Sequence, residues 1–510
     1  MGPDRVTALN KALRTATTRR SGVRVEDDSY KWWALSCTSL GMLLATINSG
    51  TLIIALPDLE RSLHTSLLEL VWVILVYMIA STVLVLSAGR LSDQFGRKRA
   101  YISGFALFAF ASLGAGFAGN GTQLILWRIL QGVGGSLLFA NAAAIVTDAF
   151  PREQLGLAMG TNTMVAAIGL VIGPVLGGAL VAISWPWVFW FNVPLGLAGS
   201  AWAALVLREL TGHSEDTAFD LIGTVTFLIG LTGLVLGISK GGISGWSSPV
   251  VIGGLIAAAV LLPAFVVIER HHPAPMLDLT IFSNRLFSAA AAAAFINGLA
   301  RFALMFVFVF YFQGVQGDSP IVAGIKLAPL ALGMLISSPL AGMWADRRGS
   351  RGMAVLGMLV TAAGLASMTA LGRDTGYLES GLCLFVVGVG SGMFNSPNTA
   401  AMMGTVAAHR RGIAAAARVL VQNTGAVISI AFVIAVVTSS VPRSTLFAVF
   451  SGLANHISDA QLSPFIANMQ TALWCLSAIS IVGAFVAAAR PKHVQAPAAE
   501  PAERPLEAAA

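Results

Sequence analysis

Apolar runs of about 20 residues or more recur fourteen times in this 510-residue sequence, and they restrict its fold more than any other feature. A helix of about 20 apolar residues crosses the hydrocarbon core of a bilayer. In hydrocarbon every backbone amide and carbonyl must be paired, and these runs are too long and uniform for barrel strands. The sequence therefore predicts an all-α integral membrane protein with 14 transmembrane helices. The runs are 33–56, 67–88, 101–119, 123–147, 157–182, 187–207, 221–239, 249–268, 287–312, 321–343, 353–372, 379–404, 412–438 and 468–489.

Charged residues make up only 11% of the chain, against roughly 25% in soluble domains. Apolar residues make up 56%. This balance disfavours a soluble enzyme, a disordered chain and a disulfide scaffold. The three cysteines, Cys37, Cys383 and Cys475, lie in apolar runs and are interpreted as reduced packing residues.

The 31 Lys and Arg residues are distributed unevenly between the two predicted sides of the membrane. With the N-terminus inside, cytoplasmic segments carry 23 of them and outer loops carry four, and the remaining four fall within runs. This asymmetry favours an even number of spans with both termini cytoplasmic. The opening segment is polar and basic, so it is not interpreted as a cleaved signal peptide.

An internal repeat relates the two halves of the sequence. Gly89, Asp93 and Gly96 recur with the same spacing as Gly342, Asp346 and Gly349, and cations follow each set. Repeats of this kind are typical of secondary transporters, whose substrate site lies between the halves. The expected units are a basic cytoplasmic tail (1–31), an N-terminal six-helix bundle (32–208), a linker with two extra transmembrane helices (209–286), a C-terminal six-helix bundle (287–490) and a disordered cytoplasmic tail (491–510).

Four segments carry a family resemblance: Gly89–Arg99 after the second span, Arg128–Gly135 in the fourth, Gly169–Gly178 in the fifth and Trp185–Gly196 at the sixth. In register with 14 spans, they resemble the fourteen-span drug:proton antiporter family of the major facilitator superfamily, the multidrug efflux type. The resemblance implies an inner-membrane exporter that works by alternating access and is driven by proton import.

The resemblance also implies roles for ionisable residues. Asp93 would sit at the N-terminus of a later helix, and Arg97 would pair with Asp148, forming a clasp that favours the outward-open state. The alternative is that the cations of this loop only fix topology. Arg128 corresponds to an arginine linked to proton coupling, or it is a structural hydrogen-bond hub. Glu69 and Asp148 are the acids expected to reach into a cavity.

The glycines Gly169, Gly173, Gly177 and Gly178 recur at about one helical turn and predict a flat face for a neighbouring helix. Pro174 removes one helical hydrogen bond and bends the span. The resemblance implies that this face seals a leak path and marks antiport. The alternative interpretation, that these glycines only allow ordinary close packing of two helices, makes nearly the same structural claim.

Polar, charged and aromatic residues in spans expected to face the centre are candidates for a substrate cavity. Ionisable residues in mid-membrane are costly and are functional candidates, whereas amides frequently bond one helix to another. The candidates are Asn48, Tyr77, Asn141, Asn162, Asn297, Arg301, Phe302, Phe306, Asn395, Asn398, Arg418 and Gln422.

Asn48 is a departure from the family pattern, which often has an acid at this place. Asparagine cannot carry a proton, so either protons use Asp93, Asp148 or Glu69, or the coupling of transport differs from that of the family. The cationic interior favours neutral, zwitterionic or anionic amphipathic substrates, lipids included. A lipid translocator that needs no protons and a non-transporting membrane sensor remain the alternatives.

Other chemistry is not indicated. The sequence has no Gly-x-x-x-x-Gly-Lys-Ser/Thr segment for ATP, no spaced metal ligands and no nucleophile–base set. We therefore expect no enzyme activity, no metal, no nucleic-acid partner and no cofactor other than the proton as coupling ion. The expected partners are an amphipathic small molecule or lipid as substrate, and membrane lipids.

Overall fold

The computed structural model describes residues 29–150, 155–209, 220–272, 275, 277–406, 411–439, 441, 442, 445, 446, 449 and 458–490. These residues form helices and connecting turns, and no strand occurs among them. The expected tails, 1–31 and 491–510, lie outside the described residues except for 29–31. Fold class is therefore all-α, as predicted.

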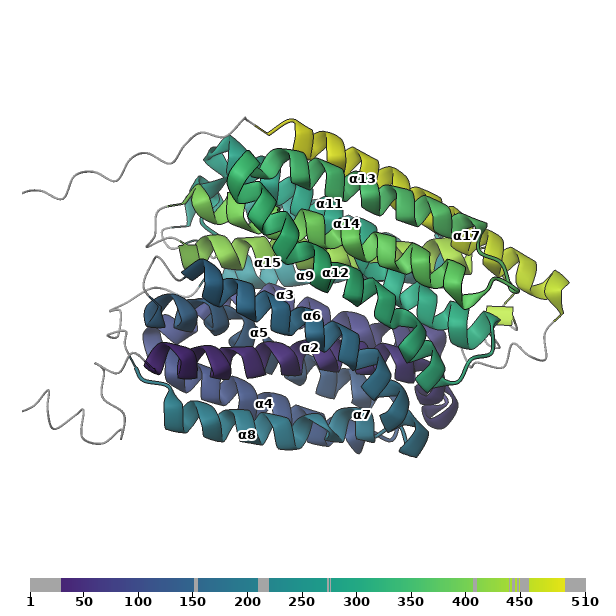
Figure 1. The fold of residues 1–510 in the computed structure, drawn as a ribbon. Coiled ribbons are helices and arrows are strands. Elements are labelled where there is room, and N and C mark those ends of the chain that lie inside the picture. Colours follow the sequence, from purple (N-terminus) through teal and green to yellow (C-terminus); the bar gives the residue numbers. More distant parts are fainter. Residues whose placement is uncertain are drawn as a thin grey trace, which may run out of the picture.

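Two groups of helices lie against each other, below and above the middle of Figure 1. The first comprises α2 (Tyr30–Leu63), α3 (Leu67–Phe95), α4 (Arg97–Gly116), α5 (Gly121–Ala149), α6 (Leu155–Ile183), α7 (Trp187–Trp190) and α8 (Asn192–Val206). The second comprises α11 (Arg285–Phe310), η3 (Tyr311–Val315), α12 (Pro320–Arg348), α13 (Ser350–Ser367), η4 (Met368–Ala370), α14 (Tyr377–Gly404), α15 (Arg411–Thr438) and α17 (Asp459–Ala488). We call them the first and second halves.

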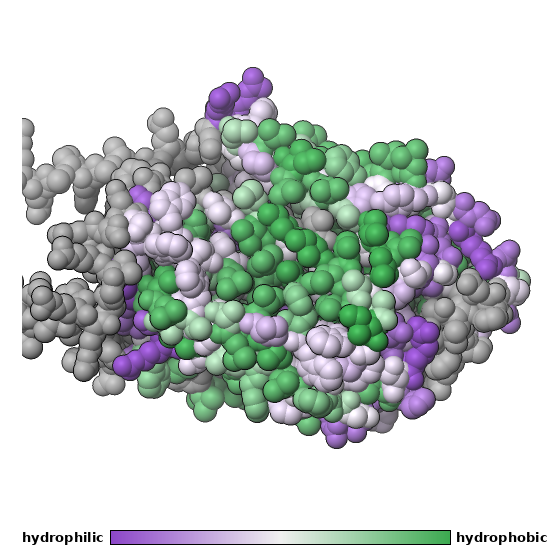
Figure 2. Space-filling view, turned by 60° about the horizontal axis from the view of Figure 1, so that its bottom comes forward, coloured by the Kyte–Doolittle hydropathy of each residue, from purple (hydrophilic) through white to green (hydrophobic). Residues whose placement is uncertain are grey.

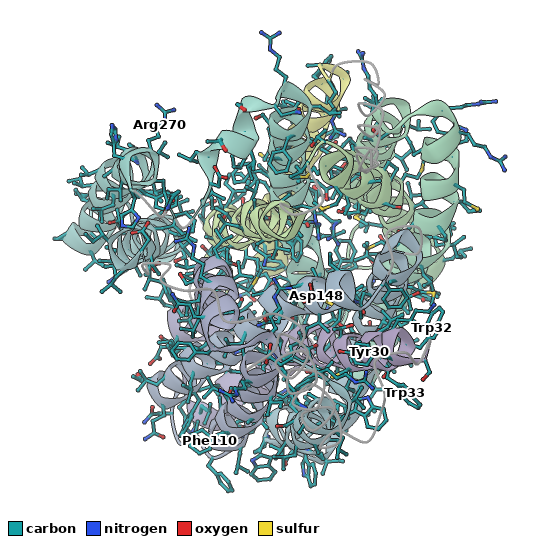
Figure 3. The ribbon with its side chains drawn as sticks, turned by 90° about the vertical axis from the view of Figure 1, so that its left-hand side faces the viewer. Tyr30, Trp32, Trp33, Phe110, Asp148 and Arg270 are labelled. Atoms are coloured by element: carbon teal, nitrogen blue, oxygen red, sulfur yellow. The ribbon has the colours of Figure 1, made fainter. Side chains whose placement is uncertain are left out.

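Two further helices, α9 (Leu221–Ser244) and α10 (Pro249–His271), connect the halves through η2 (Leu279–Ser283). They pack on each other, and α9 contacts α3 of the first half and α15 of the second. Ser87 and Thr224 share a hydrogen bond of 2.9 Å between α3 and α9, and Gly242 lies directly against Ala435 of α15. Seen along the helices, α10 lies at the edge, where Arg270 points outward (Figure 3).

Twelve helices in the described residues are long and apolar enough to cross a membrane. Helix α4 is not among them, because glycines, serines and the cations of its first turn dilute its apolar residues. In α6 the segment Ile172–Ile183 is apolar, but it is shorter than a membrane span requires. The multi-span membrane architecture is thus confirmed, whereas the number 14 is not decided by length and hydropathy.

The outer surface is apolar where a soluble protein would be polar. Figure 2 shows a hydrophobic band across the middle of one face, with hydrophilic residues gathered toward the ends. Large apolar side chains such as Phe110, Phe117, Leu205, Leu378 and Phe485 are more than half exposed. Because such a band would be unstable in water, it indicates a surface that contacts lipid.

We name the two ends of the bundle by the chain. The near end is where α2 begins and α17 ends, on the left of Figure 1, and the far end is opposite. The repeated glycines predicted from sequence lie at the near end. Gly96 joins α3 to α4 with φ of 100°, and Gly349 joins α12 to α13 with φ of 89°. Both need the left-handed region that glycine enters without strain, so the repeat encodes the same tight turn twice.

One predicted boundary is wrong, and two predicted spans contain an irregular turn. The last span was expected to begin at 468, but α17 begins at Asp459 with a capping box formed by Ser458 and Gln461. The run 187–207 corresponds to one candidate span, Trp187–Val206, in which a turn at Phe191 separates α7 from α8. The run 287–312 lies within the candidate span Arg285–Val315, which ends in the wider π-helical turn of η3.

Candidate functional site

Helix α6 is wedged between the two halves through its glycines. A β-carbon at Gly173 would lie 3.0 Å from the Gly50 Cα of α2, and one at Gly177 would lie 2.6 Å from the Thr51 Cα. On the other side, a β-carbon at Gly178 would lie 2.6 Å from the Ile321 Cα of α12. We call the contact of α6 with α12 the seam. Only backbones without side chains can approach this closely.

The seam belongs to the far end, because Ile321 lies in the first turn of α12 and Gly178 lies in the last two turns of α6. The seam continues toward the middle of the bundle at Gly324, where an added β-carbon would meet the Pro174 carbonyl. A second cross-link between the halves lies nearby, since Gln313 Nε2 donates to the Ile54 carbonyl at 3.1 Å. The halves are therefore joined at the far end. Gly169 contacts Thr46 of α2 instead.

Arg128 is the centre of a buried hydrogen-bond network in the first half. Its side chain is 1% exposed. Its Nε donates to the Val73 carbonyl of α3 at 3.0 Å, its Nη1 donates to Gln131 Oε1, and its guanidinium lies 4.3 Å from the centre of the Tyr77 ring. Every one of these partners is uncharged, so the cation is held by dipoles and an aromatic face.

Gln131 extends this network to three more helices. Its Nε2 donates to Asn48 Oδ1 of α2 at 3.1 Å and to Ser112 Oγ of α4 at 2.7 Å. Asn48 Oδ1 also accepts from Asn192 Nδ2 of α8 at 3.3 Å. The structure thus brings the predicted residues Asn48, Tyr77 and Arg128 together. Gln131, Ser112 and Asn192 were missed as members, and of these only Gln131 shares a helix face with Arg128 in the sequence.

Arg97 and Asp148 lie together at the near end. Arg97 Nη1 is 2.6 Å from Asp148 Oδ2, and the two side chains are 21% and 25% exposed. Glu209, which sequence reasoning missed, accepts from the Arg97 backbone amide at 2.8 Å and so caps the start of α4. Asp148 lies where the halves meet in the end view (Figure 3). Asp93 belongs to the last turn of α3, but its side chain is outside the described part of the structure.

Glu69, which was expected to reach into a cavity, has a local capping role in the structure. It lies at the far end, where its carboxylate accepts from the Ser66 amide at 2.9 Å and closes a capping box at the start of α3. Thr122 of α5 donates to the same carboxylate at 3.3 Å. The sequence Ser-x-x-Glu before an apolar run is a known signal for this arrangement. A role for Glu69 in proton coupling stays a prediction.

Two predicted amides of the first half bond helices to each other. Asn141 Nδ2 donates to Ser92 Oγ at 2.7 Å, which links α5 to α3. Asn162 Oδ1 accepts from Ser39 Oγ at 2.8 Å, which links α6 to α2. Among the described residues, no hydrogen bond links either side chain to the Arg128 network.

The second half holds a polar chain on α14 and α15. Arg418 Nη1 donates to Gln422 Oε1 at 2.9 Å, and Gln422 Nε2 donates to Asn395 Oδ1 at 3.2 Å. All three side chains are partly exposed. Asn398 is separate: its Nδ2 donates to the Ala290 carbonyl at 3.2 Å, and its Oδ1 accepts from Arg490.

Helix α11 carries the remaining predicted cavity residues. Asn297 Nδ2 contacts Met358 Sδ at 3.5 Å, and Arg301 Nη1 contacts Met334 Sδ at 3.7 Å. The Arg301 guanidinium lies 4.6 Å from the centre of the Phe302 ring. Phe306 is buried and packs edge-on against Phe310 with ring centres 4.8 Å apart.

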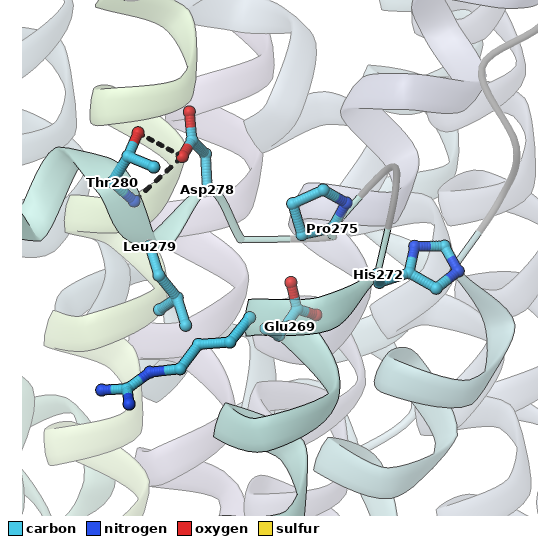
Figure 4. Close-up of a pocket in the computed structure, with 7 residues that line it drawn as sticks. Glu269, His272, Pro275, Asp278, Leu279 and Thr280 are labelled. Carbon is cyan, nitrogen blue, oxygen red and sulfur yellow. Dashed lines mark hydrogen bonds between the residues drawn. The ribbon is translucent and has the colours of Figure 1, made fainter.

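A buried acid pair at the near end was not foreseen. Asp220 caps α9 by accepting from the Gly223 amide at 2.7 Å, and Glu269 of α10 accepts from the Leu277 amide at 2.8 Å. A β-carbon at Gly223 would touch Asp220 and lie 2.7 Å from Glu269 Oε1, so both carboxyls crowd one glycine. Glu269 and His272 line a pocket of about 430 Å³ (Figure 4). The two acids are 49 residues apart, so no local pattern could pair them.

Arg490 is a further missed residue. It follows α17, is 1% exposed, and its Nη2 donates to Asn398 Oδ1. Burial lowers the pKa of Arg490 to about 10, which leaves it protonated at neutral pH. Its position at the start of a polar tail gave no sign of burial. It ties the end of α17 to α14.

The fold defines a class of protein: two packed helical halves in a membrane, with a polar interior and a glycine seam between them. The model of the Major Facilitator Superfamily matches residues 38–430, and the chain belongs to that family. It is a multi-pass membrane transporter and not an enzyme.

Similar proteins agree with this assignment. The tetracenomycin C resistance and export protein of Streptomyces glaucescens is 31% identical over 376 residues, which cover 74% of this chain and 69% of that protein. Multidrug resistance protein 3 of Bacillus subtilis is 29% identical, with 83% and 84% covered. The uncharacterized MFS-type transporter EfpA of Mycobacterium tuberculosis is 31% identical, with 86% and 83% covered. These relatives support the predicted kinship with drug-efflux transporters.

A solved structure has the same fold. It is a bacterial homolog of the human lysosomal transporter Spinster in an inward-facing, unoccupied conformation. The TM-score is 0.63, the identity is 14%, and the alignment covers 90% of this chain and 97% of that one. At this identity the match concerns the fold alone.

Proposed function

We propose that this transporter is an exporter of amphipathic drugs or other small molecules, driven by proton import through alternating access. Relatives that are named for export of, or resistance to, drugs support the substrate class. The observation that carries the proposal is the seam: the halves are joined at the far end by close backbone contacts of Gly178 and Gly324. Opening there would release a substrate that entered from the near end.

The proposal includes the topology. The twelve candidate spans cross the membrane together with α4 and α6, which makes fourteen, and the near end with both termini faces the cytoplasm. The supporting argument is the distribution of cations, 23 on one side against four on the other. The expected six-helix units 32–208 and 287–490 correspond to the first and second halves, with 209–286 as linker.

Proton coupling is assigned to the near end. Asn48 cannot carry a proton, and its side-chain oxygen accepts hydrogen bonds from Gln131 and Asn192. Asp148 remains as an acid at the junction of the halves, with Asp93 in the neighbouring turn. Protonation of Asp148 would release Arg97, and the pair would then act as a latch between states. Arg128 would act through its network rather than by exchanging a proton.

A transport experiment tests export and coupling together. Purified protein in proteoliposomes with an imposed pH gradient is given ethidium, a neutral dye and a fluorescent phospholipid in separate runs. We expect the neutral dye to move only with the gradient, and movement to stop when a protonophore collapses it. Dye movement that ignores the gradient would contradict antiport.

Reversal of the near-end pair tests the latch. Arg97→Asp and Asp148→Arg are each expected to lower the transport rate by about tenfold or more, because each leaves like charges in contact at a half-buried site. The double variant restores the opposite charges and is expected to recover a large part of the rate. A double variant no better than either single variant would show that the pairing itself is not required.

A second function, translocation of lipids without proton coupling, has one specific argument. No acid lies among the hydrogen-bond partners of the interior arginines Arg128, Arg301 and Arg418. Movement of the phospholipid alone in the same assay, with or without the gradient, would favour this function over drug export.

A further inference from the structure

Arg301 is a buried cation that the described residues leave without an oxygen acceptor. It is 9% exposed and lies just beyond the middle of α11, on the side of the far end. Its Nη1 meets only the sulfur of Met334, and its Nε has no hydrogen-bond partner. One face of the guanidinium is covered by Phe302. Sulfur is a weak acceptor, so most of the donor capacity of this group is unused.

The same protein satisfies another buried arginine with its own atoms. Arg128 is also buried, but it donates to the Val73 carbonyl and to Gln131 and lies over Tyr77. An unpaired buried charge costs several kcal/mol, and ionisable groups kept inside a membrane usually serve function. The contrast indicates that the partner of Arg301 comes from outside the protein.

A hydroxyl on the same helix as Met334 is also unsatisfied. Ser337 lies about one turn from Met334 on α12, is 6% exposed, and its Oγ has no hydrogen-bond partner. A serine hydroxyl can donate to an oxygen anion, as can a guanidinium. Ser337 Oγ lies against Gly392 of α14, so the anion site is assigned to Arg301, whose guanidinium suits a carboxylate, sulfonate or phosphate.

A second arginine lies between this position and the near end. Arg418 on α15 is partly exposed and bonds only to Gln422 among the described residues. The backbones of α11 and α15 touch where Gly298 meets the Gln422 carbonyl. Arg418 lies one turn before that contact and Arg301 about one turn beyond it. The ion pairs of the described residues include neither arginine.

We infer that Arg301 binds an anionic oxygen group on an amphipathic substrate, which reaches it past Arg418 from the near end. The inference rests on the proposed export function and adds a preference for amphipathic anions within its substrate class. The apolar body of the substrate lies against Phe302 and the methionine side chain, and its anion completes the hydrogen bonds that Arg301 lacks.

Two dyes separate charge from shape. The anion 8-anilinonaphthalene-1-sulfonate and the neutral N-phenyl-1-naphthylamine share one aromatic skeleton. Their binding to purified protein is measured by quenching of tryptophan fluorescence. We expect Arg301→Gln to weaken the sulfonate about tenfold or more and the neutral dye by less than about twofold. Arg301→Lys should fall between. Arg270→Gln removes an exposed cation on α10 and should change neither dye.

Equal effects of Arg301→Gln on both dyes, or none on either, would overturn the inference, as would a wild type that prefers the neutral dye. Failure of export is recognised separately. A wild type that binds the sulfonate yet transports neither dye refutes the proposed function and leaves the site. If wild-type protein exports the neutral dye but the Arg301→Gln variant binds both dyes as wild type does, the anion site is refuted and the proposed function is not.

Thermal unfolding gives a second reading that does not depend on dye transport. Arg301→Met removes an unsatisfied charge, so the ligand-free variant is expected to unfold at a higher temperature than wild type. The sulfonate should raise the midpoint of wild type and not that of the variant. A lower midpoint with unchanged sulfonate binding would mean that Arg301 is structural.

The anion can belong to a free amphipath or to a lipid. Sulfonate binding is therefore repeated in nanodiscs of phosphatidylcholine with and without phosphatidylglycerol. Competition by phosphatidylglycerol that Arg301→Gln abolishes assigns the site to a lipid phosphate, whereas unchanged sulfonate affinity assigns it to free amphipathic anions. Competition that persists in Arg301→Gln contradicts binding at Arg301.

Discussion

Gly178→Leu is expected to abolish transport by preventing closure of the seam. A β-carbon at Gly178 would lie 2.6 Å from both the Ile321 Cα and the Pro320 carbonyl oxygen. Both are backbone atoms and cannot turn aside as a side chain could. The helices α6 and α12 must therefore separate at the far end, and the far-closed state becomes unavailable. We expect the dye transport rate in proteoliposomes to fall by about a hundredfold, since overpacking of this kind costs about 1–3 kcal/mol.

Gly253→Leu is the matched control for this substitution. Gly253 also lies within a long apolar helix, α10, but an added β-carbon there meets nothing within 4 Å. The control variant should transport at the wild-type rate. If Gly178→Leu also did so, the seam would have no part in the cycle. If both variants failed, leucine would be acting on helix insertion or folding, which the amount of monodisperse protein would reveal.

Arg128→Leu is expected to give the largest loss of stability among single changes in the first half. The change leaves the Val73 carbonyl and Gln131 Oε1 without their donor, in a site where Arg128 is 1% exposed. Each buried polar group left unpaired costs about 1–3 kcal/mol. Two such groups predict a loss of about 2–6 kcal/mol, before the gap above Tyr77 is counted. Thermal unfolding in detergent, followed by tryptophan fluorescence, measures the change.

Two comparisons give this prediction its meaning. Arg128→Lys keeps the charge, but an ammonium cannot reproduce the forked donors, so it should recover only part of the stability. Arg301→Leu removes a guanidinium with no oxygen acceptor among the described residues, so it should not destabilise. If Arg128→Leu and Arg301→Leu lowered the midpoint equally, loss of packing rather than loss of hydrogen bonds would be the cause.

Much of the fold was predictable because hydropathy and turn chemistry are local. The apolar runs gave the helices, and the spacing of Gly96 and Gly349 gave two equivalent turns. The Ser66–Glu69 capping box was also a local signal, although the acid was first interpreted as a cavity residue. Errors arose where apolar sequence and helix ends do not coincide. Polar residues begin α17 because a helix can extend beyond hydrocarbon.

The candidate site was predictable in its members and not in its connections. Arg128, Asn48 and Tyr77 were selected as polar residues in apolar spans, and the structure joins them through Gln131. The contact of Arg97 with Asp148 was implied by family resemblance alone. Glu209, Glu269 and Arg490 were missed, since each acquires its environment from a segment far away in the chain.

The sequence by itself determined that this chain is a helical membrane protein with two related halves, because burial in lipid requires long apolar helices and leaves glycine at tight turns. It also determined which residues were unusual inside the membrane. Only the tertiary structure decided which of these are satisfied. Arg128 and Arg301 look alike in the sequence, yet one is enclosed by carbonyl and amide oxygens and the other by sulfur and an aromatic ring. That difference depends on which distant helices face each arginine, and no local pattern records it.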